Sequence, residues 1–169
     1  MTAILSLGSN LGDRLAHLVQ ARAALAQLPQ TRLVAASRVY ETEPVGVADT
    51  CREQQYLNAI VILETALEVH LFSDAMHAIE TRHGRQRTSD RNAPRVIDID
   101  LISFENLVLE EPSLQLPHPR AHLRRFVCEP LAELLPDLTL PGQALAIRAI
   151  LKQLPASPGV TLATETWQE

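Results

Sequence analysis

The sequence contains little cysteine. Its two cysteines, Cys51 and Cys128, lie far apart and have no neighbours at metal-ligand spacing. Such a pair does not supply the disulfide framework on which small secreted domains depend. We therefore expect a protein of the reducing cytoplasm.

Lysine and aromatic residues are also scarce. Lys152 is the only lysine, aromatic residues make up 4% of the chain, and the net charge is −5. A nucleic-acid-binding module needs a basic surface, and RNA-binding sheets add aromatic side chains on which bases stack. A ferredoxin-like nucleic-acid-binding module is therefore a weak alternative, and we expect no nucleic acid partner.

Long apolar runs are missing as well. No stretch approaches the roughly 20 apolar residues of a membrane span, and the N-terminus MTAILSLGSN has no basic start. We therefore expect no membrane partner. Hydrophobic content of 46% and charged content of 21% instead predict one globular domain over residues 1–169.

Hydrophobic periodicity and turn residues predict alternating strands and helices. Thr65 and Glu68, at capping-box spacing, open a helix that stops at Gly84. A short hairpin is expected after residue 104, and 155–169 forms a loose tail, with a short strand and docking of Trp167 left open. The other elements expected are strands at 3–7, 33–42, 56–64 and 96–101 and helices at 13–28, 123–135 and 143–154.

The order strand, helix, strand, strand, helix, strand is that of the βαββαβ unit in ferredoxin-like folds. We therefore predict an α+β fold with an antiparallel sheet, helices on one sheet face and a C-terminal helical extension. The opposite sheet face is expected to be free for a substrate.

Residues 96–101, VIDIDL, alternate between apolar and acidic side chains. Successive side chains of a strand point to opposite faces, so Asp98 and Asp100 share one face. Two carboxylates at this spacing suit Mg²⁺, which takes one or two carboxylates together with substrate phosphates. The alternative is the solvated face of an edge strand, where adjacent like charges cost some stability.

Five arginines precede this strand in a segment with almost no apolar residues. Guanidinium groups remain charged and bind oxyanions bidentately. Together with the carboxylate pair they predict a site for Mg²⁺ and a polyphosphate, and a solvated loop is the alternative. The five are Arg82, Arg85, Arg87, Arg91 and Arg95.

Further features have both a functional and a plain interpretation. Asn58 lies in an apolar strand, where its amide could bind the edge of a heterocycle or face solvent. His118, between two prolines, could contact phosphate or be a surface histidine. The loop 43–55 and the turn from Gly8 to Gly12 could border a ligand or simply connect elements.

Taken in order, these motifs resemble the 6-hydroxymethyl-7,8-dihydropterin pyrophosphokinase family of folate biosynthesis. The resemblance covers about residues 3–141 and rests on LGSNLGDR, VYETEPVG, YLNA, PRVIDIDL, and LPHPR followed by RRF. The ordered set is highly specific, and PRVIDIDL with the later PHP is its strongest part. The resemblance implies that the pterin hydroxymethyl oxygen attacks the β-phosphorus of ATP, that AMP leaves, and that two Mg²⁺ ions take part.

The resemblance also implies residue roles. Arg85, Arg95, Asp98 and Asp100 would be catalytic, and the two aspartates would bind the metal. The implied pterin pocket is Thr42, Pro44, Val45, Gly46, Tyr56, Asn58 and Phe126, with Phe126 stacked on the flat ring. The implied ATP side is Glu80, Arg87, Arg91, Arg95, Ile99, His118 and Arg124. The expected partners are ATP and the hydroxymethylpterin, and we expect a monomer.

Two positions depart from the family pattern. Asn92 stands where many relatives have an aromatic residue, and Arg125 stands where a small residue is usual. These changes keep another hypothesis open, a regulatory paralogue that binds nucleotide without turnover. The aspartate pair and His118 favour a working enzyme.

Overall fold

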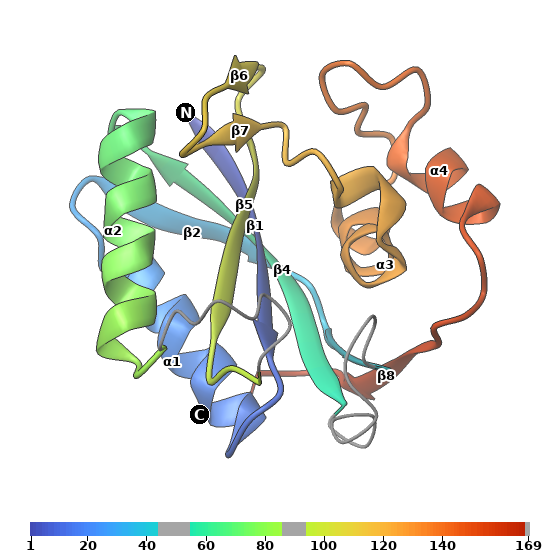
Figure 1. Ribbon diagram of the computed structural model, residues 1–169, viewed down its shortest axis with the longest axis horizontal. Coiled ribbons are helices and arrows are strands. Elements are labelled where there is room, and N and C mark those ends of the chain that lie inside the picture. Colours follow the sequence, from blue (N-terminus) through green and yellow to red (C-terminus); the bar gives the residue numbers. More distant parts are fainter. Residues whose placement is uncertain (44–54, 86–93, 168–169) are drawn as a thin grey trace.

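The computed structural model describes residues 1–43, 55–85 and 94–167 (Figure 1). The elements in chain order are β1 (Thr2–Ser9), α1 (Arg14–Ala26), β2 (Thr31–Ala36), β3 (Val39–Thr42), β4 (Tyr56–Thr65), α2 (Val69–Arg82), β5 (Asp98–Phe104), β6 (Leu109–Glu110), β7 (Gln115–Leu116), a 3₁₀ turn (Ala121–Leu123), α3 (Arg125–Leu134), α4 (Ile147–Gln153) and β8 (Val160–Thr164).

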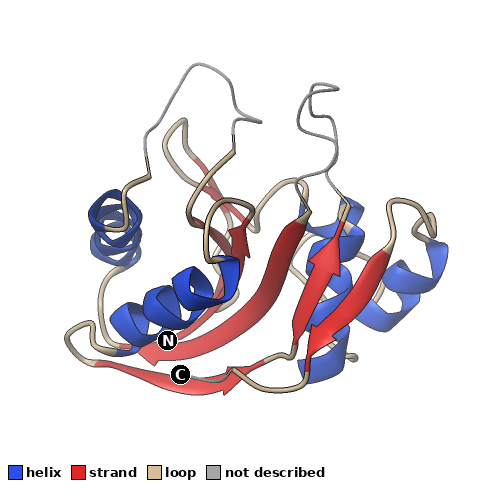
Figure 2. Ribbon diagram, turned by 90° about the horizontal axis from the view of Figure 1, so that it is seen from below, coloured by secondary structure: helices blue, strands red, loops and turns tan. Residues whose placement is uncertain are grey.

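In the described residues, one central sheet has six strands. Its order is β5-β1-β4-β3-β8, and β2 pairs with the same edge of β4 as β3 does. β1 lies between β4 and β5 and is antiparallel to both. Figure 2 shows the strands as a twisted layer between two groups of helices. The prediction of a ferredoxin-like α+β fold with a C-terminal helical extension is confirmed.

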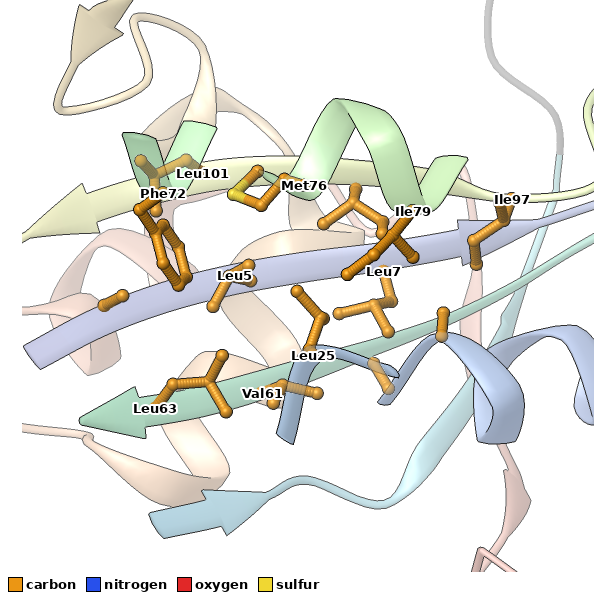
Figure 3. Close-up of a cluster of buried hydrophobic side chains, with 14 of the residues drawn as sticks. Leu5, Leu7, Leu25, Val61, Leu63, Phe72, Met76, Ile79, Ile97 and Leu101 are labelled. Carbon is orange, nitrogen blue, oxygen red and sulfur yellow. The ribbon is translucent and has the colours of Figure 1, made fainter. Parts of the chain in front are cut away.

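Alternation along β1 builds two cores. Leu5 and Leu7 face α1 and α2, where they join Leu25, Phe72 and Met76 (Figure 3). The next residues along the strand point the other way, because side chains alternate across a sheet. The first core therefore holds α1 and α2 on one face of the sheet.

The opposite face is not free along its length, so that part of the prediction is wrong. Ile4 and Ile60 of this face pack with Val127 of α3 and Ile147 of α4. Aliphatic side chains at these positions can only be shielded from water by another apolar layer. The same face carries small and polar side chains at one end of the sheet, around Gly8, and the candidate site lies there.

The strand predicted at 33–42 is two strands, β2 and β3. Ser37 separates them, and its hydroxyl accepts a hydrogen bond from the Ile60 N–H at 2.9 Å. The Ser37 N–H donates to the Ile60 carbonyl, also at 2.9 Å. The register along β4 shifts within β2 as well, between Leu33 and Ala35. Local sequence did not reveal the break, because the side chain of Ser37 replaces a backbone ladder bond.

The capping box predicted at Thr65 is wrong. Thr65 ends β4, and its hydroxyl accepts from the Leu67 N–H at 3.1 Å. Glu68 is the N-cap of α2, and its carboxylate accepts from the N–H groups of His70 and Leu71. Capping by Glu68 satisfies two of the backbone donors that every helix N-terminus leaves unpaired.

The C-terminal segment is ordered on the sheet. β8 pairs with β3, and the Trp167 indole donates to the Ser37 carbonyl at 2.7 Å. The Arg22 guanidinium lies 4.7 Å from the Trp167 ring centroid. The tail is therefore not loose, whereas the expected hairpin is present as the β6–β7 pair. None of the helices in the described part of the chain is long and apolar enough to span a membrane.

Candidate active site

A row of residues crosses the sheet at the uncovered end. Gly8 of β1 pairs with Asn58 on one side and with Asp98 on the other. A Cβ atom at Gly8 would lie 3.1 Å from Asn58 Oδ1 and 4.0 Å from Asp98 Cβ. A side chain at this position would therefore crowd the amide, and glycine allows Asn58 Oδ1 to lie close to β1.

Asp98 and Asp100 share the sheet face that α3 partly covers, as their alternation predicts. Asp98 Oδ1 lies 2.6 Å from Arg85 Nη1, and Asp98 Oδ2 lies 2.7 Å from Arg95 Nη1. Asp100 Oδ2 lies 3.3 Å from Arg124 Nη1. Three arginines from different segments thus converge on the carboxylate pair, which excludes a plain solvated strand face.

The two carboxylates have different electrostatic surroundings. Burial is the main cause that raises the pKa of Asp100, and the charge of Asp98 raises it further. His118, Arg124 and Arg85 act in the opposite direction. A cation between the carboxylates would relieve this repulsion, because an opposite charge favours the ionised form.

His118 faces Asp100, with its Nε2 at 4.0 Å from Asp100 Oδ2. Burial lowers the pKa of His118, although the Asp100 charge opposes this shift. Its Nδ1 accepts a hydrogen bond from the Arg120 N–H at 3.1 Å. A neutral imidazole that accepts at Nδ1 carries its proton on Nε2, so His118 presents a donor to the carboxylate end of the site.

Glu80, at the end of α2, is 1% exposed. Its Oε1 accepts the Ile99 N–H at 2.8 Å, and the same atom forms an ion pair with Arg85. Ile99 itself directs its side chain into the first core. Glu80 therefore ties α2 to the segment between the two aspartates, and the nucleotide roles of Glu80 and Ile99 stay predictions.

Asn10 anchors the arginine that enters β5. Its side-chain oxygen accepts the Arg95 N–H at 2.8 Å, and its own N–H donates to the Arg95 carbonyl at 3.2 Å. Asn10 is 6% exposed. The sequence indicated a turn here, and the reciprocal pair with Arg95 was missed because 85 residues separate the two positions.

Four residues that were predicted to form the pterin pocket, Thr42, Tyr56, Asn58 and Phe126, lie in the described part of the chain. Asn58 Nδ2 donates to Thr42 Oγ1 at 2.7 Å, and Asn58 is 4% exposed, so it does not face solvent. Tyr56 begins β4 and pairs with Thr42. At the start of α3, the Phe126 ring lies 5.4 Å from the Arg124 guanidinium carbon.

Arg14 is a further residue that sequence reasoning missed. Its Nη1 lies 2.9 Å from Glu41 Oε1 and donates to the Gln55 carbonyl at 2.9 Å. Arg14 therefore joins Glu41 and Gln55, which lie on either side of residues 44–54, and its place in LGDR was the only signal. The remaining predicted site positions, Pro44, Val45, Gly46, Arg87 and Arg91, lie outside the described residues, as does Asn92.

The donors present fit a metal that shares its ligands with a substrate. Over residues 1–43, 55–85 and 94–167, no three His, Cys, Asp or Glu side chains cluster closely enough to hold a metal alone. Mg²⁺ needs no such cluster, because one or two carboxylates and substrate phosphates suffice. Asp98 and Asp100 provide the carboxylates, and the surrounding arginines suit the phosphates.

Comparison with solved structures agrees with the fold. An HPPK-DHPS protein crystallised in complex with substrates has a TM-score of 0.68 and 14% identity, covering 90% of this chain and 43% of that one. A Plasmodium falciparum HPPK-DHPS variant with pterin and p-hydroxybenzoate also has a TM-score of 0.68, with 13% identity over 90% of this chain and 43% of its own. At this identity the likeness concerns the fold alone.

Comparison of sequences identifies the family. A 2-amino-4-hydroxy-6-hydroxymethyldihydropteridine pyrophosphokinase from Pseudomonas aeruginosa is 40% identical over 136 residues, covering 80% of this chain and 82% of its own. The enzyme of that name from Methylorubrum extorquens is 41% identical over 155 residues, covering 92% and 94%. The family model of 7,8-dihydro-6-hydroxymethylpterin-pyrophosphokinase matches residues 4–136. With this site geometry and these relatives, the chain belongs to the 7,8-dihydro-6-hydroxymethylpterin pyrophosphokinase family.

Proposed function

We propose that this chain transfers pyrophosphate from ATP to the hydroxymethyl group of 6-hydroxymethyl-7,8-dihydropterin, releasing AMP, in folate biosynthesis. The observation that supports it most is the row Asp98–Gly8–Asn58. Asn58 and Asp98 lie on one sheet face on either side of a glycine, an arrangement that suits a heterocycle-binding amide next to a metal-binding carboxylate.

On the pterin side, Asn58 is the recognition residue. One of its amide hydrogens is used by Thr42, which orients the group. Its Oδ1 lies beside Gly8, and we propose that it accepts from the N–H groups on the edge of the pterin. Phe126 is the stacking partner, because a flat ring against a flat heterocycle buries area at little entropic cost.

On the ATP side, Asp98 and Asp100 are the ligands of two Mg²⁺ ions, which would neutralise charge on the phosphates and the entering and leaving oxygens. Arg85, Arg95 and Arg124 now neutralise the two carboxylates. With the carboxylates on metal, these arginines can bind phosphate oxygens instead. His118 adds a neutral Nε2–H donor. Phosphoryl transfer asks the protein mainly for such positioning and charge neutralisation.

The proposal extends to domain organisation, oligomeric state and location in the cell. The two cores form on opposite faces of one sheet, so we take residues 1–169 as a single domain. We also propose that the enzyme is a monomer, as expected from the sequence. Its two cysteines and its use of ATP support a cytoplasmic location.

A product assay tests the proposal. Purified protein is incubated with ATP, Mg²⁺ and 6-hydroxymethyl-7,8-dihydropterin, and the nucleotides are resolved. AMP is expected only when both Mg²⁺ and the pterin are present. ADP as the product would refute pyrophosphate transfer. Binding of ATP without AMP would instead support the paralogue that has lost turnover.

A further inference from the structure

Arg125, the residue where the family usually has a small side chain, points away from the candidate site. Its Nε donates to the Pro155 carbonyl at 2.8 Å, and its Nη2 donates to the carbonyls of Leu154 at 3.0 Å and Leu151 at 3.3 Å. Its Nη1 binds Glu129 Oε2 at 2.8 Å. All three guanidinium nitrogens are therefore engaged, and its charge is balanced within α3.

The carbonyls that Arg125 binds belong to the end of α4. This helix ends at Gln153, with Leu154 as its C-cap. The last carbonyls of a helix have no partner further along the helix, and the C-terminal end favours a cation. The planar fork of arginine presents five donors in a fixed geometry and can serve several carbonyls at once, whereas lysine has three donors on a flexible stem.

The turn that holds Arg125 also carries two site residues. Arg124 and Phe126 flank it, and Arg124 Nη1 donates to Asp100 Oδ2 at 3.3 Å. The N-terminus of α3 has no side-chain cap, since Arg124 is the N-cap and makes no capping bond. The link from Arg125 to α4 is thus a polar anchor, beside the Arg124–Asp100 contact, of a helix start that has no side-chain cap.

We propose that Arg125 is a positioning residue for the pterin side of the site. By tying the first turn of α3 to the end of α4, it holds Phe126 in place to stack on the heterocycle. This inference rests on the proposed function, because it assigns the effect of Arg125 to pterin binding. It also explains why an additional arginine beside Phe126 adds no charge to the phosphate end.

The kinetic test compares Arg125→Ala and Arg125→Lys with Arg148→Ala. Arg148 is a matched control, because it lies in α4 and pairs at 2.9 Å with Asp137 while its side chain is 64% exposed. For Arg125→Ala we expect the KM for the pterin to rise about five- to tenfold, with kcat and the KM for ATP within about twofold. Arg125→Lys should lie between Arg125→Ala and the wild type. Arg148→Ala should match the wild type.

A second test, by hydrogen exchange, needs no substrate. Hydrogen exchange at residues 125–128 and 151–154 should be faster in Arg125→Ala than in the wild type and unchanged in Arg148→Ala. Unchanged exchange in Arg125→Ala would show that the tie does not exist. Faster exchange with an unchanged KM for the pterin would leave only a structural role and overturn the inference.

A rise in the KM for ATP alone would also overturn it, because Arg125 would then act on the nucleotide. A wild type that forms no AMP would refute the proposed function separately. In that case pterin fluorescence, titrated with a non-hydrolysable ATP analogue present, decides the inference. Weaker binding by Arg125→Ala than by Arg148→Ala supports it, and equal binding overturns it.

Discussion

Asp98 and Asp100 occupy the same face of β5 but are neutralised differently. Asp98 sits between Arg85 and Arg95 at 2.6 and 2.7 Å. Asp100 has a longer contact to Arg124, and burial together with the Asp98 charge raises its pKa. Asp98 thus helps to hold the metal-free fold together, whereas the charge of Asp100 is an electrostatic cost that a bound cation would remove.

Asn substitutions separate these two situations. Asp98→Asn and Asp100→Asn should each lower AMP formation by at least about 10³-fold, because each removes a proposed metal ligand. In metal-free protein, Asp98→Asn should lower the free energy of unfolding by about 2 kcal/mol, since Arg85 and Arg95 each lose a charged contact. Asp100→Asn should leave it equal to or above that of the wild type. AMP assays and thermal unfolding in a chelator measure these effects.

The pH dependence of the Asp100 effect has a definite sign. Its pKa is raised in the folded protein, so its contribution to stability is complete below the unfolded pKa of about 4 and is lost as pH rises. Any gain in the free energy of unfolding from Asp100→Asn should therefore disappear near pH 3.

Turnover by Asp98→Asn within tenfold of the wild type would contradict the metal assignment.

At the scale of elements, a polar link joins β3 to α3. The Tyr40 hydroxyl donates to Glu133 Oε2 at 2.8 Å, and the Arg38 N–H donates to Glu133 Oε1 at 3.1 Å. Tyr40 pairs with Asn58 across the sheet. The link therefore sets the distance between α3, which carries Phe126 near its start, and the strands β3 and β4, which carry Thr42 and Asn58.

Tyr40→Phe removes one bond of this link and should lower the free energy of unfolding at pH 8 by about 1–2 kcal/mol. Burial, followed by the bond to Glu133, raises the pKa of Tyr40. A raised pKa means that the contribution is complete below about pH 10 and is lost as pH rises through the folded value. Urea unfolding of both proteins at pH 8 and pH 11 should show the difference shrinking. A constant difference would mean that ionisation of Tyr40 is not linked to folding.

At the scale of the whole molecule, the sheet carries one core on each face. The second core, under α3 and α4, contains Cys128, which is 0% exposed. Its Sγ lies 3.4 Å from the Ala121 carbonyl, and burial raises the pKa of the thiol to about 11. Only the thiolate is reactive, so labelling of Cys128 requires this layer to open.

Cys128 therefore reports opening of the fold. At pH 8 its alkylation by iodoacetamide should be far slower than that of a free cysteine. The Mg²⁺ complex of a non-hydrolysable ATP analogue, at about 100 times its dissociation constant, should slow it by up to about 100-fold if labelling follows global unfolding. Peptide mass spectrometry separates Cys128 from Cys51. Labelling unaffected by this complex would show that α3 opens locally instead.

Features of this structure could be predicted when they depend on residues close together in the sequence, and could not when they depend on residues far apart. The alternation at 96–101 placed Asp98 and Asp100 on one face correctly, and the helical periodicity located α1 and α2 to within a few residues. The break at Ser37 and the coverage of the second face were not predicted. Both depend on side chains that meet partners far along the chain, as Ser37 meets Ile60.

The same distinction applies to the site. Asn58, His118 and the arginines stood out because their residue types are unusual in their local setting. Two other features did not stand out: the close approach of Asn58 to Gly8, and the hydrogen bond between Asn10 and Arg95. A glycine in a strand and an asparagine in a turn are ordinary in their local sequence.

The sequence by itself determined the fold class, the shared face of the two aspartates and the types of group available for metal and phosphate. These properties follow from residue type and from the side-chain period, which is two residues in a strand and 3.6 in a helix. Both can be read from residues that are close in the chain. Only the tertiary structure decided which arginine meets which carboxylate, that Gly8 separates Asn58 from Asp98, and that Arg125 binds α4. Strand register and helix packing bring these distant positions together, and neither is encoded in a local pattern.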